Sequence, residues 1–251
     1  MSGENNALLQ GLCLVCNIII IFGIPLGGLL LMHHKKLSPG KPFVFGMLAF
    51  FISQICIRLP ILQVVLPQVG WYQKLSTNIW SYAFFLGITA GLAEELARFL
   101  FLRFALKERR KLKDGISFGL GHGGIEAMLL IGVNNIALYV LLLTGQGTLA
   151  GTDGGTILLA GIERLSAIAF HVGATIIVLY GIRVHKSLFY TPLAILLHAV
   201  LDSSTLILPQ VFGVGTALFE ILLAIFSIGV LAGSVYWFYK NTKTGNISPS
   251  K

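Results

Sequence analysis

Residues 7–32 read ALLQGLCLVCNIIIIFGIPLGGLLLM, a run without a single acidic or basic side chain. About 20 apolar residues in a helix cross the hydrocarbon core of a bilayer, so this run is long enough to span a membrane. The preceding MSGENN (1–6) has an acidic residue and no basic cluster, unlike the start of a secretory signal peptide. We therefore expect a retained transmembrane helix at this position.

The same apolar character extends through the chain. Of its 251 residues, 55% are hydrophobic and 11% are charged, whereas soluble domains carry about 25% charged residues. The sequence predicts an all-α polytopic membrane protein with one helical-bundle domain over residues 1–240 and a disordered cytoplasmic tail over 241–251. We expect seven transmembrane helices, at 7–32, 43–66, 79–106, 117–144, 155–182, 187–208 and 213–238.

The basic residues predict an orientation. Most of the 18 lysines and arginines lie after the first, third and fifth predicted spans and in the C-terminal tail. Cytoplasmic loops are enriched in lysine and arginine, so the N-terminus is expected outside and the C-terminus in the cytoplasm. The run KERRKLK (107–113) fits this orientation signal beside the lipid bilayer, and we expect no nucleic-acid partner.

Ionisable side chains interrupt the predicted spans between residues 79 and 208. Each such group costs roughly 2.5–3.5 kcal/mol at the bilayer centre on insertion scales, and intramembrane ionisable residues mark functional sites. The residues concerned are Glu94, Glu95, Arg98, His122, Glu126, Glu163, His171, His198 and Asp202. We expect them to face one shared interior.

Spacing and depth support this convergence. Glu94 and Arg98 are four residues apart, as are His198 and Asp202, so each pair lies on one helix face. At about 1.5 Å per residue from the predicted cytoplasmic ends, Glu94, His171 and His198 all lie roughly 15 Å deep. The sequence thus predicts a site in the cytoplasmic half of the membrane that opens to the cytoplasm.

Imidazoles and carboxylates are the usual ligands of Zn²⁺, and catalytic zinc sites leave one position for water. A glutamate beside such a site can act as general base. We expect Glu126 and Asp202 to ligate directly or to orient the histidine one turn away on the same helix. The candidate metal ligands are His122, His171, His198, Asp202 and Glu126, with Glu163 as a further candidate. A metal-free reaction, in which Glu94 and His122 activate water, is the alternative.

Several motifs carry a family resemblance. EELAR (94–98) resembles the glutamate-pair-plus-arginine motif of a superfamily that contains the type II CAAX prenyl endopeptidases, the bacteriocin-processing membrane proteins and the PrsW-type proteases. AGLAEELARFLFLRFAL (90–106), GLGHGGIEAMLL (119–130) and ERLSAIAFH (163–171) are similar to the YhfC-like membrane peptidases within it. The resemblance implies an intramembrane endopeptidase of the bacterial plasma membrane, acting on a membrane-embedded or lipidated peptide.

The resemblance also implies roles for individual residues. Glu94 would be the water-activating glutamate, Glu95 and Arg98 its support, and His122 a further catalytic residue. Two other functions stay open, because a proton-coupled transporter also uses buried carboxylates and imidazoles and a non-catalytic membrane scaffold can retain them. Arg58, close to Pro60 on the second predicted span, is interpreted as a kink or snorkelling position.

Overall fold

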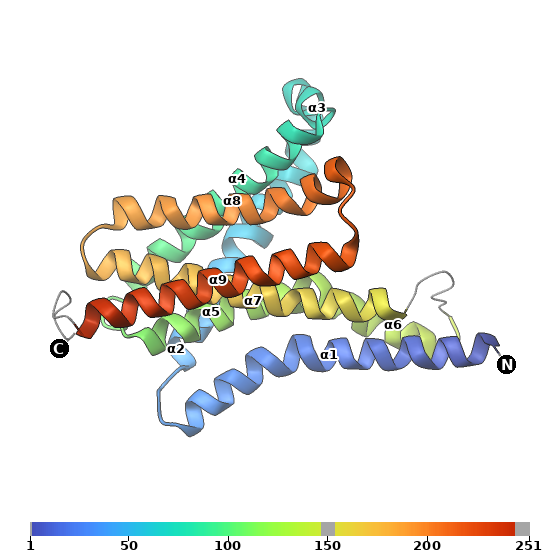
Figure 1. The fold of residues 1–251 in the computed structure, drawn as a ribbon, viewed down its shortest axis with the longest axis horizontal. Helices are drawn as coiled ribbons and strands as arrows, with labels where there is room; N and C mark the ends of the chain where they lie inside the picture. The colour runs from blue at the N-terminus through green and yellow to red at the C-terminus, as the bar shows by residue number, and fades with distance from the viewer. Residues whose placement is uncertain (1, 147–153, 244–251) are drawn as a thin grey trace.

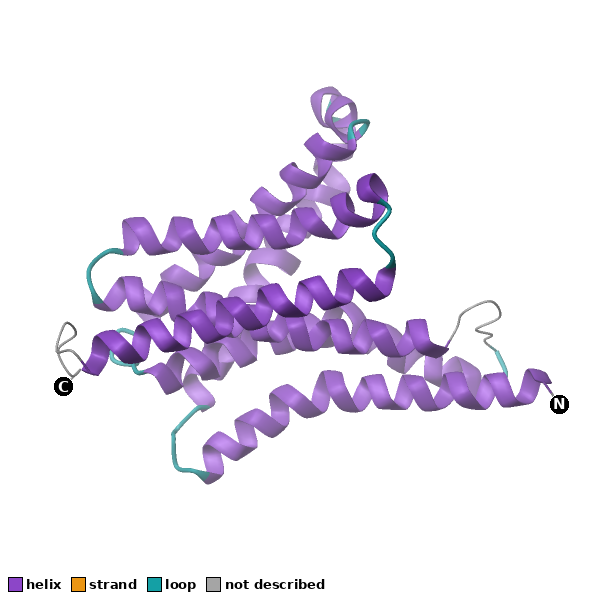
Figure 2. Cartoon of the chain, viewed as in Figure 1, coloured by secondary structure: helices purple, strands orange, loops and turns teal. Residues whose placement is uncertain are grey.

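In the computed structural model the chain is a bundle of long helices, and residues 2–146 and 154–243 are described (Figures 1 and 2). No strand occurs in these two ranges. The helices are α1 (Ser2–His34), α2 (Gly40–Phe50), η1 (Phe51–Arg58), η2 (Ile61–Val65), η3 (Leu66–Gln68), α3 (Gly70–Ser76), α4 (Ile79–Leu100), η4 (Phe101–Ala105), α5 (Leu112–Ala127), η5 (Met128–Gly132), α6 (Val133–Leu143), α7 (Gly154–Arg183), α8 (Ser187–Phe212) and α9 (Thr216–Lys243).

The helices have the length and composition of membrane spans. Six stretches within the described residues are long and apolar enough to cross a bilayer: Leu8–His34, Gly40–Gln68, Leu112–Leu143, Gly154–Arg183, Ser187–Phe212 and Thr216–Thr242. The prediction of an all-helical membrane protein is therefore confirmed. The predicted third span, which contains α4, is helical but is not one of the six, and it carries Glu94, Glu95 and Arg98.

The central helix of the bundle is α7. It packs against α1, α5, α8 and α9, and most of its residues are buried. Gly173 permits this close packing, because a Cβ atom there would lie 2.9 Å from the backbone nitrogen of Leu231 on α9. The α4 helix packs chiefly against α8 and η1. The residues of α4, α5, α7 and α8 that face inward therefore meet in one interior.

The basic connections of the chain lie at one end of the bundle. The connections after α1, η4 and α7, together with the C-terminal end of α9, lie at the end marked C in Figure 1. The α3 helix, the start of α7 and the turn between α8 and α9 lie at the opposite end. Because α9 continues to Lys243, residues 241–243 of the predicted tail are helical. Residues 244–251 of that tail lie outside the described residues.

Helices α2 and α5 approach each other through a reciprocal pair of glycines. A Cβ atom on Gly121 would lie 2.1 Å from the carbonyl oxygen of Phe43, and one on Gly46 would lie 2.0 Å from that of Phe118. The obstacles are backbone atoms, which no side-chain rotation can move. This contact fixes the position of α5 and therefore of His122, the next residue after Gly121.

We expect Gly121→Ala to destabilise the protein by about 1–3 kcal/mol, because overpacking forces the two backbones apart. Thermal unfolding of the purified protein in detergent measures the effect. Gly229→Ala on α9 is the matched control, since nothing lies within 4 Å of a Cβ atom there and alanine favours a helix. Equal unfolding temperatures for Gly121→Ala and the unsubstituted protein would contradict this packing argument.

Candidate active site

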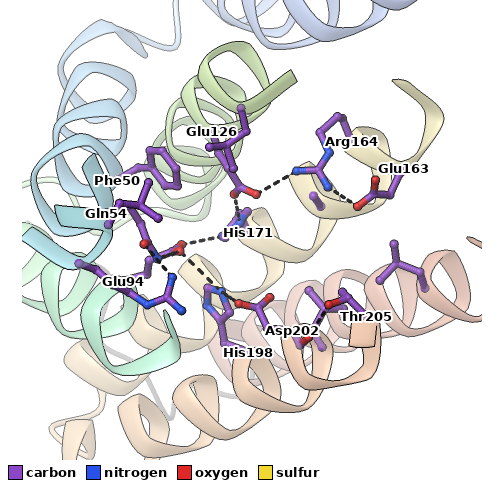
Figure 3. Close-up of a pocket in the computed structure, with 16 residues that line it drawn as sticks. Phe50, Gln54, Glu94, Glu126, Glu163, Arg164, His171, His198, Asp202 and Thr205 are labelled. Atoms are coloured by element: carbon purple, nitrogen blue, oxygen red, sulfur yellow. Dashed lines mark hydrogen bonds and ion pairs between the residues drawn. The ribbon is translucent and has the colours of Figure 1, made fainter. Parts of the chain in front are cut away.

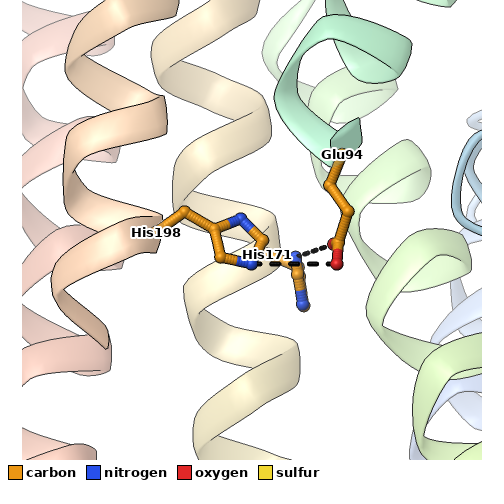
Figure 4. A group of neighbouring side chains, drawn as sticks. All are labelled: Glu94, His171 and His198. Atoms are coloured by element: carbon orange, nitrogen blue, oxygen red, sulfur yellow. Dashed lines mark ion pairs between the residues drawn. The ribbon is translucent and has the colours of Figure 1, made fainter. Parts of the chain in front are cut away.

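Three predicted site residues from three different helices meet in the interior. Glu94 of α4, His171 of α7 and His198 of α8 each offer a ligand atom, and these atoms lie within 4.8 Å of one another (Figure 4). Oε2 of Glu94 is 3.9 Å from Nδ1 of His171, and Oε1 is 3.8 Å from Nε2 of His198. All three side chains are buried. The predicted convergence of these helices is thus present in the structure.

His122 of α5 belongs to the same cluster. Its Nε2 lies 2.9 Å from Oε2 of Glu94, and its ring centroid is 4.8 Å from that of His171. The other ring nitrogen, Nδ1, is buried and has no hydrogen-bond partner. His122 therefore contacts the carboxylate that is central to the cluster, through one nitrogen only.

Glu95 and Arg98 form an ion pair in which both side chains are 0% exposed. Each then reaches a histidine on another helix. Oε1 of Glu95 lies 2.9 Å from Nδ1 of His198, and Nη2 of Arg98 lies 2.9 Å from Nδ1 of His171. Because a carboxylate can only accept, Nδ1 of His198 donates. In the neutral form of this imidazole, Nε2 carries the lone pair and lies 3.8 Å from Oε1 of Glu94.

The same reasoning assigns the tautomer of His171. Arginine can only donate, so Nδ1 of His171 accepts and its proton is on Nε2. Nε2 lies 2.5 Å from Oε2 of Glu126. The ion pair of Glu95 and Arg98 thus orients two imidazoles on neighbouring helices, which is how partners behind a histidine control its ligand properties.

The spacing of four residues predicted that Glu126 orients His122, and this prediction is wrong. Glu126 contacts His171 on α7 instead, and Nη1 of Arg164 donates to it over 3.1 Å. The reason is the position of His122, whose Nε2 faces α4 and not along its own helix. Asp202 does lie near the histidine of its own helix, with Oδ2 3.7 Å from Nε2 of His198. Glu163 pairs with Arg164.

A cavity of about 160 Å³ adjoins this cluster (Figure 3). Polar side chains from several helices line it: Gln54, Arg58, Glu94, Glu126, Glu163, Arg164, His171, His198, Asp202 and Thr205. A polar space of this size holds ordered water, which needs two to four hydrogen-bonding partners. The cavity can therefore bring water to Glu94 inside an apolar bundle.

Comparison with known proteins identifies the family of this chain. The profile of the YhfC intramembrane metalloprotease family matches residues 19–227, which is most of the chain. The protein belongs to this family. It is also 32% identical over 244 residues to a Bacillus subtilis (strain 168) protein described as "Uncharacterized membrane protein YhfC", an alignment that covers 88% of this chain and 92% of that protein. No solved structure matches the chain.

In this YhfC-family protein, two residues that sequence reasoning missed hold Glu94 in place. Gln54 of η1 donates from its amide nitrogen to Oε1 of Glu94. Nη1 of Arg58 donates to the amide oxygen of Gln54 over 3.1 Å. Because Arg58 can only donate, the amide of Gln54 has one orientation, and its NH₂ group must face Glu94.

The interpretation of Arg58 as a snorkelling residue is therefore wrong. Its Nη2 donates to the carbonyl oxygen of Leu86 over 2.7 Å and its Nε to Thr89 over 3.2 Å, both on α4. The segment that carries Gln54 and Arg58 is a π-helix, a form that occurs frequently at functional sites. Their spacing of four residues on an otherwise apolar span was the available signal.

Proposed function

We propose that this protein is an intramembrane endopeptidase that hydrolyses peptide bonds with water activated at Glu94. The observation that carries the proposal is the meeting of Glu94, His171 and His198 beside a polar cavity of about 160 Å³. Burying so many ionisable groups in a membrane is costly. Hydrolysis accounts for that cost, because it needs a base, ligands and water at one point inside an apolar bundle.

The donor set fits a metal ion. Two imidazoles and one carboxylate from separate helices make the three-ligand pattern of catalytic zinc sites. In the neutral form of His198, Nε2 carries a lone pair that can bind a cation, because Nδ1 donates to Glu95. Nδ1 of His171 also accepts from Arg98, so Arg98 and a cation compete for this atom. A zinc ion held by these residues would supply a Lewis acid for the carbonyl and a water of lowered pKa.

The chain's own residues handle the proton. As the water oxygen attacks the peptide carbon, its proton passes to the pair formed by Oε2 of Glu94 and Nε2 of His122. The same pair returns the proton to the amine nitrogen as the carbon–nitrogen bond breaks. Gln54 holds the other oxygen of Glu94, and Glu95 and Arg98 hold the two imidazoles. Glu126 and Asp202 contact these imidazoles and line the cavity.

The topology proposed for this enzyme has seven spans, with α4 as the third. The ionisable residues of α4 are buried, whereas Leu92, Leu96 and Leu100 are exposed on its outer face. A helix with this pattern can meet lipid although its hydropathy is low. We propose an outside N-terminus and a cytoplasmic C-terminus in a bacterial plasma membrane, with residues 1–240 as one domain and 241–251 as a tail.

The Glu94 cluster lies nearer to the basic end of the bundle. His198 is 11 residues from the start of α8, and His171 is 12 from the end of α7. The site is thus proposed in the cytoplasmic half of the membrane. Its substrate would be a membrane-embedded or lipidated peptide, as the resemblance to the YhfC-like membrane peptidases suggests.

Removal of the metal tests the proposal. We expect the purified protein to contain about one zinc ion per chain by elemental analysis. A chelator such as 1,10-phenanthroline should abolish cleavage, and added Zn²⁺ should restore it. Because the substrate is unidentified, cleavage is measured by mass spectrometry of peptide termini in bacterial membranes incubated with the protein in liposomes.

Other results would each select one alternative. Undiminished cleavage by a metal-free preparation would favour the reaction in which Glu94 and His122 act alone. If no new peptide termini appear in any of the membrane samples, with or without Zn²⁺, the proposal of an endopeptidase is contradicted. Proton-coupled uptake into the same liposomes would then indicate a transporter, and its absence a scaffold.

A further inference from the structure

The cavity extends from the Glu94 cluster in one direction along the bundle. On α7, the lining residues other than His171 all lie toward the helix N-terminus: Glu163, Arg164 and Ala167. On α8, those other than His198 all lie toward the C-terminus: Leu201, Asp202 and Thr205. Both directions lead to the same end of the bundle, where α7 begins and α8 turns into α9 (Figure 1).

The other helices show the same direction. Glu126 and Leu130 follow His122 along α5 and η5, and Leu223 lies near the start of α9. On η1 the lining extends from Gln54 to Arg58, away from the basic connection that precedes α2. The α4 helix contributes only Glu94, and Phe50 at the end of α2 lies before Gln54. The other lining helices continue the cavity toward the end that holds α3.

Packed side chains close the opposite side. A hydrophobic cluster fills the space between Glu94 and the basic connections. Nine of its members are less than 2% exposed, and the larger ones include Leu102, Leu106, Phe118, Ile176, Leu179 and Ile182. Protein interiors of this kind are packed as densely as organic crystals, with few voids larger than a water molecule. Neither water nor a peptide can pass through this cluster.

Exposure rises along the cavity in the same direction. Of the side chains that line the cavity, those of Glu94, His171 and His198 are 6%, 4% and 3% exposed. Farther along the cavity, Glu163 is 25% exposed and Asp202 is 35% exposed. Figure 3 shows the row from Glu94 through Glu126 and Arg164 to Glu163. The cavity is therefore a passage whose lining side chains are more exposed with distance from the Glu94 cluster.

We propose that water and substrate reach Glu94 from the end of the bundle opposite the basic connections. In the orientation proposed above, this is the extracytoplasmic end, and not the cytoplasmic opening that residue depth led us to expect. The statement about substrate rests on the proposed function. Four carboxylates and two guanidinium groups line the passage, so it favours an extended segment with neutral or basic side chains over an acidic one.

A matched pair of alanines tests the direction. Ala167 and Ala174 lie on α7 on either side of His171; Ala167 lines the passage and Ala174 is completely buried. Ala167→Cys and Ala174→Cys are each made after Cys13, Cys16 and Cys56 are replaced by alanine. Ser76→Cys on α3 and Lys107→Cys in a basic connection mark the two ends, since both positions are exposed.

Intact cells are treated with a small, cationic, membrane-impermeant methanethiosulfonate. We expect Ser76→Cys and Ala167→Cys to react, Lys107→Cys to react only after permeabilisation, and Ala174→Cys not to react at all. Modification of Ala167→Cys should also remove its cleavage activity. Should Ala167→Cys fail to fold, Thr205→Cys replaces it, because Thr205 is exposed and lines the same passage.

Two outcomes would overturn the inference. In the first, Ala167→Cys reacts only under the conditions in which Lys107→Cys reacts, that is, after permeabilisation. In the second, Ala174→Cys reacts with the reagent as rapidly as Ala167→Cys does. If Lys107→Cys reacts in intact cells and Ser76→Cys only after permeabilisation, the proposed membrane orientation is refuted. The passage is still supported in that case if Ala167→Cys reacts under the same conditions as Ser76→Cys. Labelling reports access and not hydrolysis. If the cysteines are labelled as expected but no cleavage is found, the proposed endopeptidase activity is refuted and the proposed passage is not.

Discussion

Glu94→Gln is expected to reduce peptide cleavage by about 10³-fold or more, since proton transfer by a positioned base contributes about 10²–10⁴-fold. The amide keeps the size of the side chain but accepts no proton and is a poor metal ligand. The effect is expected with or without a metal, because Glu94 contacts His122 and lies near His171 and His198 in either case. Cleavage is measured by terminal-peptide mass spectrometry.

The control must separate chemistry from folding. Glu108→Gln removes a carboxylate from the connection after η4, outside the cavity lining, and should leave cleavage unchanged. Thermal unfolding of Glu94→Gln should stay close to that of the unsubstituted protein, because the amide can still bond to Gln54 and His122. Cleavage by Glu94→Gln at more than about a tenth of the original rate would exclude a role for Glu94 in proton transfer.

Arg98→Met should give the largest loss of stability. Its guanidinium is fully buried and pairs with Glu95. Its removal therefore leaves a carboxylate charge in the interior without its cationic partner, with Nδ1 of His198 as the remaining donor. Breaking one side of a buried ion pair costs about 3–5 kcal/mol. His171 also loses the donor at its Nδ1. The free energy of unfolding in detergent, measured by denaturant titration, gives the size of the effect.

A second substitution distinguishes charge burial from loss of packing. In the double variant Glu95→Gln with Arg98→Met, no unpaired charge is left, and stability should largely return, because apolar replacements of whole buried pairs are often neutral. Cleavage should stay low, since Nδ1 of His198 then faces an amide. Equal destabilisation of the single and double variants would show that packing, and not the charge of Glu95, explains the effect of Arg98→Met.

Most of the candidate site was predictable because ionisable residues in an apolar helix must face inward. This rule placed Glu94, His122, His171 and His198 together. In the structure the three histidines lie within 4 Å of the carboxylate of Glu94. It could not assign partners between helices. Glu126 was expected beside His122 but contacts His171, because the rotation of α5 about its axis depends on its glycine contact with α2.

Gln54 and Arg58 show a second kind of limit. The spacing of Gln54 and Arg58 on an apolar span indicated that the two side chains share a helix face, but it did not identify Glu94 as their partner. Only the approach of η1 to α4 makes Gln54 a donor to that carboxylate and Arg58 a donor to Gln54.

The sequence by itself determined the helical membrane fold, the helix positions to within about five residues and the set of inward-facing residues. Hydropathy and the cost of burying charge act locally along the chain. Tertiary structure decided which residues pair, that Leu102, Phe118 and Ile176 close the basic side of the site, and toward which end the cavity extends. These features depend on how neighbouring helices rotate and slide against each other. Close contacts such as that of Gly121 with Phe43 set this arrangement, and no pattern within a single helix encodes it.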